Sequence, residues 1–485
     1  MGIVLKQSLQ NTTITYLGFG IGAINTLFLY TYILSPNYYG LVTFILATGT
    51  ILMPVMALGI HNTFVRFYSS QSEKEKDGFL TLMLISPFMS ILPLGILTWI
   101  FYDSIADFFA KENSLVKDYV WYVFLVGFAM AYFEIFYAWT KVQLKSVFGN
   151  FMKEVFARIG VLCLLLFLYF DWISLQFFFK ALVGLYLLRT LIMKLYAFRI
   201  KWPRITLAFP TQTRAILTYS LYIILGGSAA VLLLEIDKFM INQFVPLENL
   251  AFYGVGVYIA MVIIVPSRAM HQITYPLTAR LLSENNHFEL ENLYKKSSLT
   301  LFIASGILYV LILLNLDDLY QLLPEAYRNG FTVVFLIGLA KVFDSLLGNI
   351  NSILFNSKYY RTILLLGVLL AISTVLLNLW LIPIFGIDGA ALASFCAIFV
   401  FNCIKLVVVK IKFGLFPFGK DTFKILATLV LLGFLFWQLN FSFHPIANIV
   451  LKSILIVAMY LGILYRFNIS EDITGLLSKF LKRKE

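Results

Sequence analysis

Several ionisable residues lie inside long apolar stretches, where a charge is costly unless it is paired or faces water. The clearest case is Lys341 with Asp344, both inside the apolar segment 331–356. Their i, i+3 spacing places them on one face of a helix, so they can form a pair. As a functional site, Lys341 would hold an anionic group and Asp344 would release it or bind a coupling cation. The alternative is a self-neutralising pair that locks two helices together.

Arg268 and His271 also share a helix face, in the apolar segment 251–279. An arginine recognises phosphate well because its planar group donates two parallel hydrogen bonds. The alternative is that Arg268 only extends to the lipid head groups. Arg66, beside His61, has a similar place near the end of the segment 39–65, where anchoring at the membrane surface also explains it.

Glu134 is the carboxylate that we expect to matter most in the first half of the chain. Glu154 and Arg158, four residues apart, are most simply a structural ion pair. Asn25 is a candidate for a hydrogen bond between helices. Glu235, Asp237 and Lys238 lie toward the outer end of an apolar segment, where they are either gate residues or part of a solvated helix end.

The composition decides what kind of elements must carry these residues. Hydrophobic residues make up 60% of the 485 and charged residues 13%, and the mean hydropathy is +0.88. Soluble domains are about half apolar and a quarter charged, so we expect an all-α integral membrane protein. A helix needs about 20 residues to cross a bilayer, which predicts about fourteen spans: 12–34, 39–65, 79–101, 118–138, 150–170, 173–196, 216–236, 251–279, 297–315, 331–356, 361–383, 387–410, 422–440 and 446–465.

The basic residues give an orientation for these spans. Most of the 37 Lys and Arg residues fall in alternate loops, and such loops face the cytoplasm. The other loops keep few basic residues, among them Lys111, Lys117 and Arg328. Both termini are therefore expected in the cytoplasm, with no cleaved signal peptide. The tail 469–485 is predicted to be a basic amphipathic surface helix or a frayed terminus.

The two halves of the chain share landmarks. Gly40 and Gly254 each open a helix, and an Arg follows each glycine 26 residues later. Between glycine and arginine lies a proline, Pro54 in the first half and Pro266 in the second. A proline removes one backbone hydrogen bond and kinks a helix, so Pro54 and Pro266 are candidate hinge or gate residues. The alternative is that they only shape helix packing.

This repeat predicts two parallel six-helix lobes, an arrangement found in transporters. The predicted parts are an N-lobe at 1–200, a C-lobe at 201–415, two further helices at 416–468 and the tail at 469–485.

Two segments carry a resemblance to a known family. They are Leu381-Ile-Pro-Ile-Phe-Gly-Ile-Asp-Gly-Ala-Ala-Leu-Ala393, and Leu234-Glu-Ile-Asp-Lys-Phe-Met-Ile-Asn242 with Tyr253-Gly254 after it. With six plus six plus two helices, the chain resembles the polysaccharide-exporting flippases of the multidrug/oligosaccharidyl-lipid/polysaccharide exporter superfamily. The small residues of the first segment also have a packing role, because they let helix backbones approach closely.

The resemblance implies a flippase of the bacterial cytoplasmic membrane. It would move a lipid-linked, diphosphate-bearing oligosaccharide to the outer leaflet for surface polysaccharide assembly. The cargo would cross by alternating access through a cationic central cavity lined by the candidate residues above. Expected partners are this lipid-linked substrate, membrane lipids and other polysaccharide-assembly proteins, and no nucleic acid.

Other classes of protein remain as alternatives. A sodium- or proton-coupled multidrug exporter of the same superfamily would need a cavity dominated by carboxylates. A membrane glycosyl transferase or polymerase usually needs a large loop bearing acidic or His residues, and this chain has only four His. No nucleotide-binding loop or metal-ligand spacing occurs. We therefore expect no catalysis, no metal and no cofactor apart from a coupling sodium ion or proton.

Overall fold

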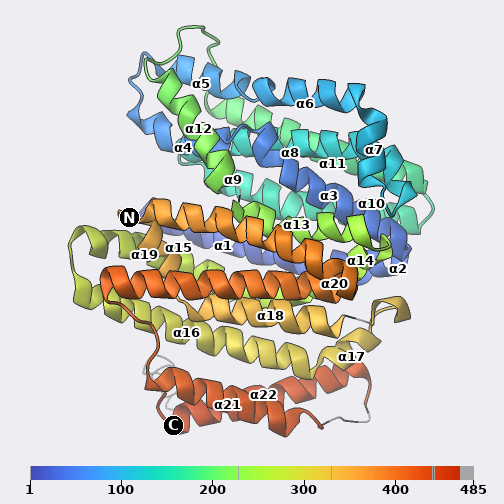
Figure 1. Ribbon diagram of the computed structural model, residues 1–485, viewed down its shortest axis with the longest axis vertical. Coiled ribbons are helices and arrows are strands. Elements are labelled where there is room, and N and C mark those ends of the chain that lie inside the picture. Colours follow the sequence, from blue (N-terminus) through green and yellow to red (C-terminus); the bar gives the residue numbers. More distant parts are fainter. Residues whose placement is uncertain (1, 228, 329, 440, 442, 470–485) are drawn as a thin grey trace. The chain divides into compact units, whose positions relative to one another are not determined.

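The structure is a computed structural model, which describes residues 2–227, 229–328, 330–439, 441 and 443–469. This part of the chain forms helices and no strand, so the all-α prediction is confirmed (Figure 1). Nine helices of the described chain are long and apolar enough to cross a membrane. The count of fourteen spans stays a prediction, because several expected spans consist of shorter helices. The tail predicted at 469–485 lies outside the described residues except for Ile469.

The chain divides into two compact units, which are described separately. The first unit comprises residues 2–254 and 367–390. Its helices are α1 (Gly2–Ala23), α2 (Tyr30–Ile33), α3 (Pro36–Met56), α4 (Ile60–Phe67), α5 (Lys76–Ile85), α6 (Phe88–Ile100), α7 (Tyr102–Phe109), α8 (Val120–Val142), α9 (Ser146–Phe151), α10 (Ala157–Tyr169), α11 (Leu175–Ile200), α12 (Thr213–Gly227), α13 (Ala229–Phe244), the first half of α14 (Glu248–Met261) and the middle of α20 (Tyr360–Phe413). Short 3-10 helices are η2 (Tyr68–Ser70) and η3 (Ser114–Tyr119).

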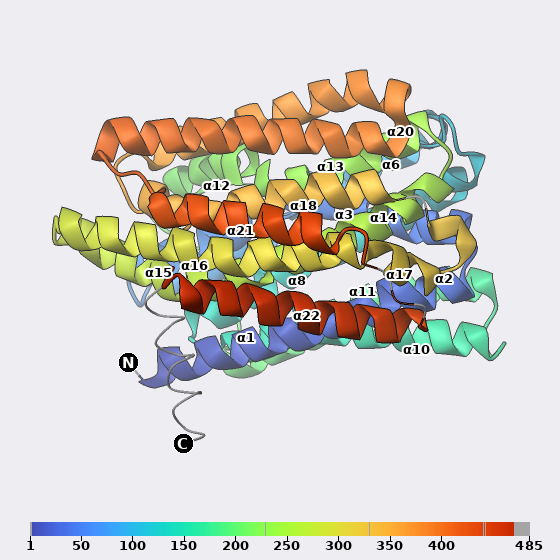
Figure 2. The same ribbon diagram turned by 90° about the horizontal axis from the view of Figure 1, so that it is seen from below.

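The second unit comprises residues 255–366 and 391–469. It contains η5 (Val262–Ile264), α15 (Val265–Ser283), α16 (His287–Leu314), α17 (Leu316–Gln321), η6 (Glu325–Tyr327), α18 (Phe331–Leu346), α19 (Ile350–Phe355), both ends of α20 (Tyr360–Phe413), α21 (Lys420–Phe436) and α22 (Pro445–Arg466). The last two helices pack on α16 and on each other (Figure 2). Lys452 of α22 pairs with Asp318 of α17 at 3.6 Å, and both are buried.

The helices that carry Pro54 and Pro266 are both interrupted close to the proline. Pro54 lies inside α3, and the chain leaves the helix at Leu58 and Gly59, both at positive φ, before α4 begins. Pro266 stands at the start of α15, directly after the 3-10 turn η5. The predicted kinks are therefore present. Their role as hinges or gates stays a prediction.

The segment that joins the spans 361–383 and 387–410 forms a kink rather than a loop. α20 continues through it, with Gly386 in a non-helical conformation at φ +59°. A Cβ on Gly389 would overlap the carbonyl oxygen of Leu381. The close backbone approach predicted for these small residues is therefore observed at Gly389, whereas a Cβ on Gly386 would meet nothing within 4 Å.

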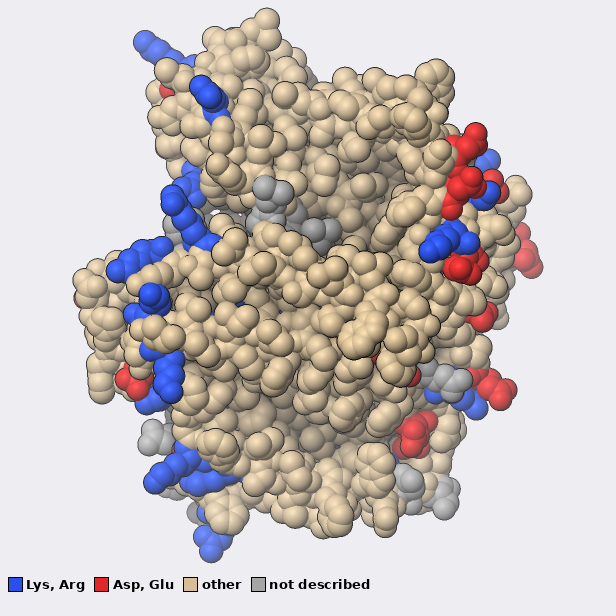
Figure 3. Space-filling view, in the orientation of Figure 1, with Lys and Arg blue, Asp and Glu red and all other residues tan. Residues whose placement is uncertain are grey.

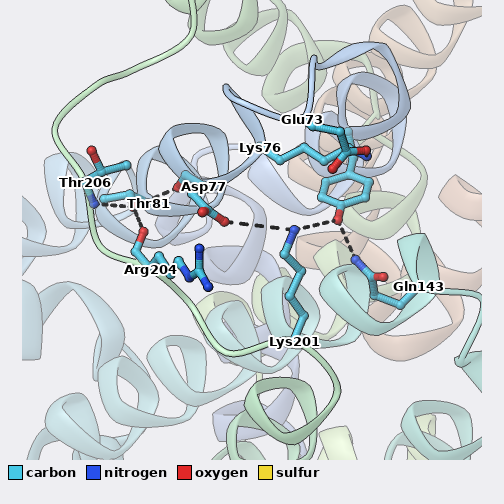
Figure 4. A network of polar contacts seen from close by, with 9 residues as sticks. Glu73, Lys76, Asp77, Thr81, Gln143, Lys201, Arg204 and Thr206 are labelled. Atoms are coloured by element: carbon cyan, nitrogen blue, oxygen red, sulfur yellow. Dashed lines mark hydrogen bonds and ion pairs between the residues drawn. The ribbon is translucent and has the colours of Figure 1, made fainter.

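Residues 201–212, called here the linker, run from α11 to α12 and are held on the first unit. Thr211 donates two hydrogen bonds to Glu75, from its backbone nitrogen at 3.1 Å and from Oγ1 at 2.7 Å. Thr81 Oγ1 donates to the carbonyl oxygen of Arg204 and accepts from the nitrogen of Thr206 (Figure 4). The connection between the predicted lobes is thus anchored at its first-lobe side.

The ends of the helices differ in charge within each unit. In the first unit one end carries Arg66, Lys76 and Lys141, and the other carries Asp103 and Asp107. In the second unit the corresponding residues are Lys296, Lys358 and Lys412 at one end and Asp317, Asp318 and Glu325 at the other. Most of the visible surface between the ends is free of charge (Figure 3). A multi-pass membrane protein has this distribution.

Candidate functional site: a charged cluster at two π-helices

Two short π-helical segments lie on neighbouring helices of the first unit. They are η1 (Ile24–Leu29), which follows α1, and η4 (Met152–Phe156), which precedes α10. Asn25 of η1 is buried, and its Nδ2 donates to the carbonyl oxygen of Arg158 at 2.8 Å. Its amide oxygen has no hydrogen-bond partner among the described residues. Single turns of π-helix inside α-helices occur often at functional sites, and here the two turns carry Asn25, Lys153 and Glu154.

Glu134 of α8 lies at the centre of a group of charged side chains. Lys153 Nζ of η4 pairs with Glu134 Oε1 at 2.5 Å. The carboxylate side chain is 12% exposed and the lysine side chain 44%. Lys141 and His61 also lie within electrostatic range of Glu134. The structure therefore brings Glu134 of α8 close to His61 of α4. The sequence had shown only that both residues belong to the first half of the chain.

A second acidic residue and two arginines adjoin this group. Arg158 Nη1 donates to Glu154 Oε2 at 2.8 Å, as the i, i+4 spacing predicted. Arg189 of α11 is buried between the rings of Phe133 and Tyr186, with its guanidinium carbon 4.2 and 4.7 Å from their centres. Arg189 is also within electrostatic range of both Glu134 and Glu154.

The cluster carries an excess of positive charge. Among the described residues, Lys141, Lys153, Arg158 and Arg189 are opposed by Glu134 and Glu154. Glu235 is also within electrostatic range of Tyr186, but it is paired with Lys238 at 2.8 Å. Lys141 Nζ lies over the Tyr137 ring at 3.9 Å, and no ion pair of Lys141 occurs among the described residues. An anion with more than one negative charge can bind such a group of donors through charge-assisted hydrogen bonds.

Arg66 lies apart from the described contacts of this cluster. It is exposed at the end of α4, 4.5 Å from the Tyr219 ring centre, and Nη1 donates to the tyrosine hydroxyl at 3.4 Å. This stacking gives Arg66 a structural partner on α12. The anchoring interpretation fits this environment, and a role in binding stays a prediction.

The second unit holds its own group of polar side chains, in which Lys341, Asn402 and Lys405 are buried and Asp344 is partly exposed. Asp344 of α18 accepts from Asn402 Nδ2 at 3.3 Å and lies 3.7 Å from Lys405 Nζ, both on α20. Lys405 also donates to Asn351 Oδ1 at 3.1 Å. Lys341 is buried one turn before Asp344 on α18.

The residues predicted on α15 lie at different exposures. His271 is half-buried and within electrostatic range of Asp344 and Lys405. Arg268 is exposed one turn earlier. Ser267 Oγ and Ser345 Oγ, 2.9 Å apart, join α15 to α18 beside them. Of the predicted residues, Asp344 and His271 thus lie near Lys405, which the sequence did not predict as a site residue. A site shared with Lys341 and Arg268 stays a prediction.

A buried carboxylate in the first unit was not among the main predicted site residues. Asp237 of α13 accepts from the Tyr253 hydroxyl and from Asn378 Nδ2, each at 2.7 Å. All three side chains are buried. The sequence had left Asp237 as a gate residue or a solvated helix end, and burial rules out the solvated end.

Lys141, Lys153, Arg189 and Lys405 were assigned from the sequence to cytoplasmic ends. One signal was available for Lys405, because it stands five residues inside the predicted span 387–410. No cluster of three or more His, Cys, Asp and Glu that could hold a metal occurs in the part of the chain that is described.

Comparisons with known proteins place this fold in a family. A family model described as "Polysaccharide biosynthesis protein" matches residues 4–282, and the chain belongs to this family. Among curated protein sequences no relative matches.

Solved structures of transporters share the fold. The lipid II flippase MurJ in an inward closed conformation is similar with a TM-score of 0.72 at 14% identity, over 95% of this chain and 100% of that one. An inward-facing multidrug resistance MATE family transporter of the MOP superfamily has a TM-score of 0.62 at 15% identity, over 85% and 98%. A MATE structure in complex with MaL6 has a TM-score of 0.57 at 14% identity, over 84% of this chain and 96% of that one. The resemblance predicted from the sequence is confirmed at the level of the polysaccharide biosynthesis family, through the family model. At these identities the likeness shows the fold alone.

Proposed function

We propose that this protein is a flippase that moves a lipid-linked, diphosphate-bearing oligosaccharide from the cytoplasmic to the outer leaflet. The membrane would be the bacterial cytoplasmic membrane, with both termini inside the cell. Family membership supports the link to polysaccharide biosynthesis, and the fold shared with transporters supports movement of a cargo rather than catalysis.

The observation that carries the proposal is the net positive charge around Glu134. A diphosphate loses its hydration when it enters the membrane, and ammonium and guanidinium groups replace the lost water contacts. Lys153 is already paired with Glu134, so an arriving diphosphate would compete with Glu134 for this lysine. The diphosphate could bind Lys141 without displacing an ion-pair partner. Alternating access would then expose the bound head group to the opposite side.

The membrane potential favours the same direction of movement. An inside-negative potential favours outward movement of an anion by about 2.3 kcal/mol per charge per 100 mV. A coupling sodium ion or proton would add to this drive, and a carboxylate is the group needed to bind it. Asp237, buried with Tyr253 and Asn378, and the half-exposed Asp344 are the candidates for that role.

The rival function is a sodium- or proton-coupled multidrug exporter. The MATE structures share the fold, and buried Asp237 is the observation that favours a cationic cargo. The two functions differ in which charges touch the cargo. An anionic cargo needs Lys141 and Lys153, whereas a cationic drug is held by Glu134 or Asp237.

A reconstituted-vesicle assay separates them. Vesicles would carry a fluorescent lipid-diphosphate oligosaccharide, and loss of fluorescence to an impermeant quencher would report its outward movement. We expect Lys153→Gln with Lys141→Gln to slow movement at least about tenfold, because two charge-assisted contacts are lost. The matched control is Lys295→Gln, a surface lysine paired with Glu291 at 2.5 Å.

Variants at the predicted second-unit residues complete the assay. Lys341→Ala and Arg268→Ala test whether these residues touch the cargo. Full lipid movement in the lysine variants would remove Lys141 and Lys153 from the mechanism. Gradient-driven efflux of a cationic dye by the wild type, without movement of the lipid-linked oligosaccharide, would replace the flippase by the exporter.

A further inference from the structure

The second unit contains a cavity at its basic end, away from the group around Asp344. Its volume is about 460 Å³. Three parts of this unit line it: the turn between α15 and α16, the turn between α19 and α20, and the end of α20 at Lys412 and Phe413.

Two unpaired lysines give this cavity its character. The Nζ atoms of Lys358 and Lys412 lie 5.4 and 5.5 Å from the centre of the same Tyr359 ring. The described residues give neither lysine an ion pair, and no Asp or Glu is among the described residues that line the cavity. His287, Asn356 and Ser357 add polar atoms to the wall.

A neighbouring cavity shows that the basic character is local. It has a volume of about 610 Å³ and is lined by Arg280, Glu284, Glu289 and Lys296 among others. There Arg280 Nε pairs with Glu284 Oε1 at 2.8 Å. Cations and carboxylates are balanced in this second cavity, although it lies at the same end of the unit.

We propose that the cavity of Lys358 and Lys412 binds a phosphate-bearing anion, supplied by the head group of an anionic membrane lipid. The ammonium groups of Lys358 and Lys412 lie near the same ring, and no carboxylate lines the described cavity wall. An anion bound in the cavity would reduce the repulsion between the two groups. Basic pockets at the cytoplasmic ends of membrane helices bind such head groups. The volume is in the range of small-ligand sites.

The bound head group would act on the elements that it joins. It would connect the turn after α15, the helix that carries Arg268 and His271, to both ends of α20, which carries Asn402 and Lys405. Because a ligand that binds only the folded state stabilises it, the second unit should become more stable in anionic membranes. The inference does not depend on the cargo.

The first arm of the test uses the whole protein in nanodiscs of phosphatidylcholine with or without phosphatidylglycerol. Native mass spectrometry would count the retained phosphatidylglycerol, and thermal unfolding would report stability. We expect Lys358→Gln with Lys412→Gln to reduce retention about fivefold or more and to remove the stabilisation by phosphatidylglycerol. The control is Arg280→Gln with Lys296→Gln, which removes two cations from the neighbouring cavity and should retain the lipid.

The second arm uses inorganic pyrophosphate with the detergent-solubilised protein. One outcome is that the Lys358→Gln, Lys412→Gln variant loses pyrophosphate binding and still retains phosphatidylglycerol as the wild type does. That result would keep a phosphate site in this cavity but show that its ligand is a soluble anion, which overturns the lipid as the source. Lys358→Arg with Lys412→Arg should restore retention. Equal retention in the wild type and the Lys358→Gln, Lys412→Gln variant, with no pyrophosphate binding that depends on these lysines, would overturn the proposal. Equal losses in the control would overturn it also, because general surface charge would then explain retention.

Discussion

Asp344 and Lys405 form an ion pair whose two partners differ in exposure. The Lys405 side chain is 2% exposed, whereas that of Asp344 is 32% exposed. A buried charge that loses its partner is far more costly than a charge that water reaches. The two residues should therefore respond differently to neutralisation.

Asp344→Asn should destabilise the protein by about 3 kcal/mol, because Lys405 would remain buried without a counter-charge. Lys405→Met should cost about 1 kcal/mol or less, because Asp344 retains Asn402 and water. Reversible SDS unfolding of the detergent-solubilised variants measures both. The double variant should be more stable than Asp344→Asn alone, and the reverse order would show that the pair is not the dominant contact of Lys405.

The sequence predicted Asp344 as a site residue but missed its lysine partner. Lys341 was the obvious candidate because it lies one turn away on the same helix. Lys405 is distant in sequence and was counted among cytoplasmic charges. Lys153 was missed for the same reason. The positive-inside rule assigns a charged residue to one side of the membrane by its place along the chain, and it does not say which helices pack together.

At the scale of elements, the linker depends on a close approach of two backbones. Gly78 near the start of α5 faces the carbonyl oxygen of Ala208, and no Cβ fits between them. Lys201 at the end of α11 contacts Asp77 at 4.0 Å and the Tyr68 hydroxyl at 3.4 Å (Figure 4). The linker is therefore held at both of its ends and in its middle.

Gly78→Ala should release the middle of the linker from α5. A spin label on Leu207→Cys, whose side chain is exposed, should become more mobile in electron paramagnetic resonance spectra. Gly184→Ala is the control, because a Cβ there meets nothing within 4 Å. Unchanged mobility in the Gly78 variant would contradict the close approach.

The end of the linker near α12 should respond to pH. Hydrogen bonds from Thr211, and a weaker contribution from Ser72, lower the pKa of Glu75 from its usual 4.5 to about 2. Because the pKa is lower when the linker is docked, docking is favoured above pH 4.5 and weakens as the pH falls from 4.5 toward 2.

The same spin label should therefore gain mobility between pH 5 and pH 3 in the wild type. Glu75→Gln should show little change over this interval, because the titrating group is gone. An identical pH response in both proteins would show that another group controls the linker.

Helix interruptions were predictable only where proline marks them. The kinks near Pro54 and Pro266 follow from the missing backbone hydrogen bond. The break between α18 and α19 at Gly348, which has φ +56°, carries no proline. The π-helices at Asn25 and Lys153 contain no proline either.

At the scale of the whole molecule, the class of protein follows from composition. Too few polar residues exist to cover a soluble protein, and the charges that are present gather at the helix ends in each unit (Figure 3). Hydropathy thus predicted the all-helical membrane fold. Hydropathy could not predict where helices are interrupted, and it therefore could not fix the number of helices. It could not predict the contacts that form the cluster around Glu134 either.

The membrane topology can be tested by labelling single cysteines. Cys163, Cys396 and Cys403 would first be replaced by Ala. An impermeant maleimide should then reach Glu73→Cys and Glu284→Cys only from the cytoplasmic side, because even numbers of spans separate these loops and the amino terminus. Asp103→Cys and Glu325→Cys should be labelled in intact cells. Labelling of Glu73→Cys and Glu284→Cys from opposite sides would contradict the parallel repeat.

The central claim is that excess positive charge in the first unit recognises an anionic head group. Its most direct test is the affinity of the purified protein for a lipid-diphosphate oligosaccharide, compared with the same lipid and sugar joined without phosphate. The wild type should bind the diphosphate form at least about tenfold more tightly, and Lys141→Gln with Lys153→Gln should lose that preference. Equal affinity for the two lipids in the wild type would contradict the account.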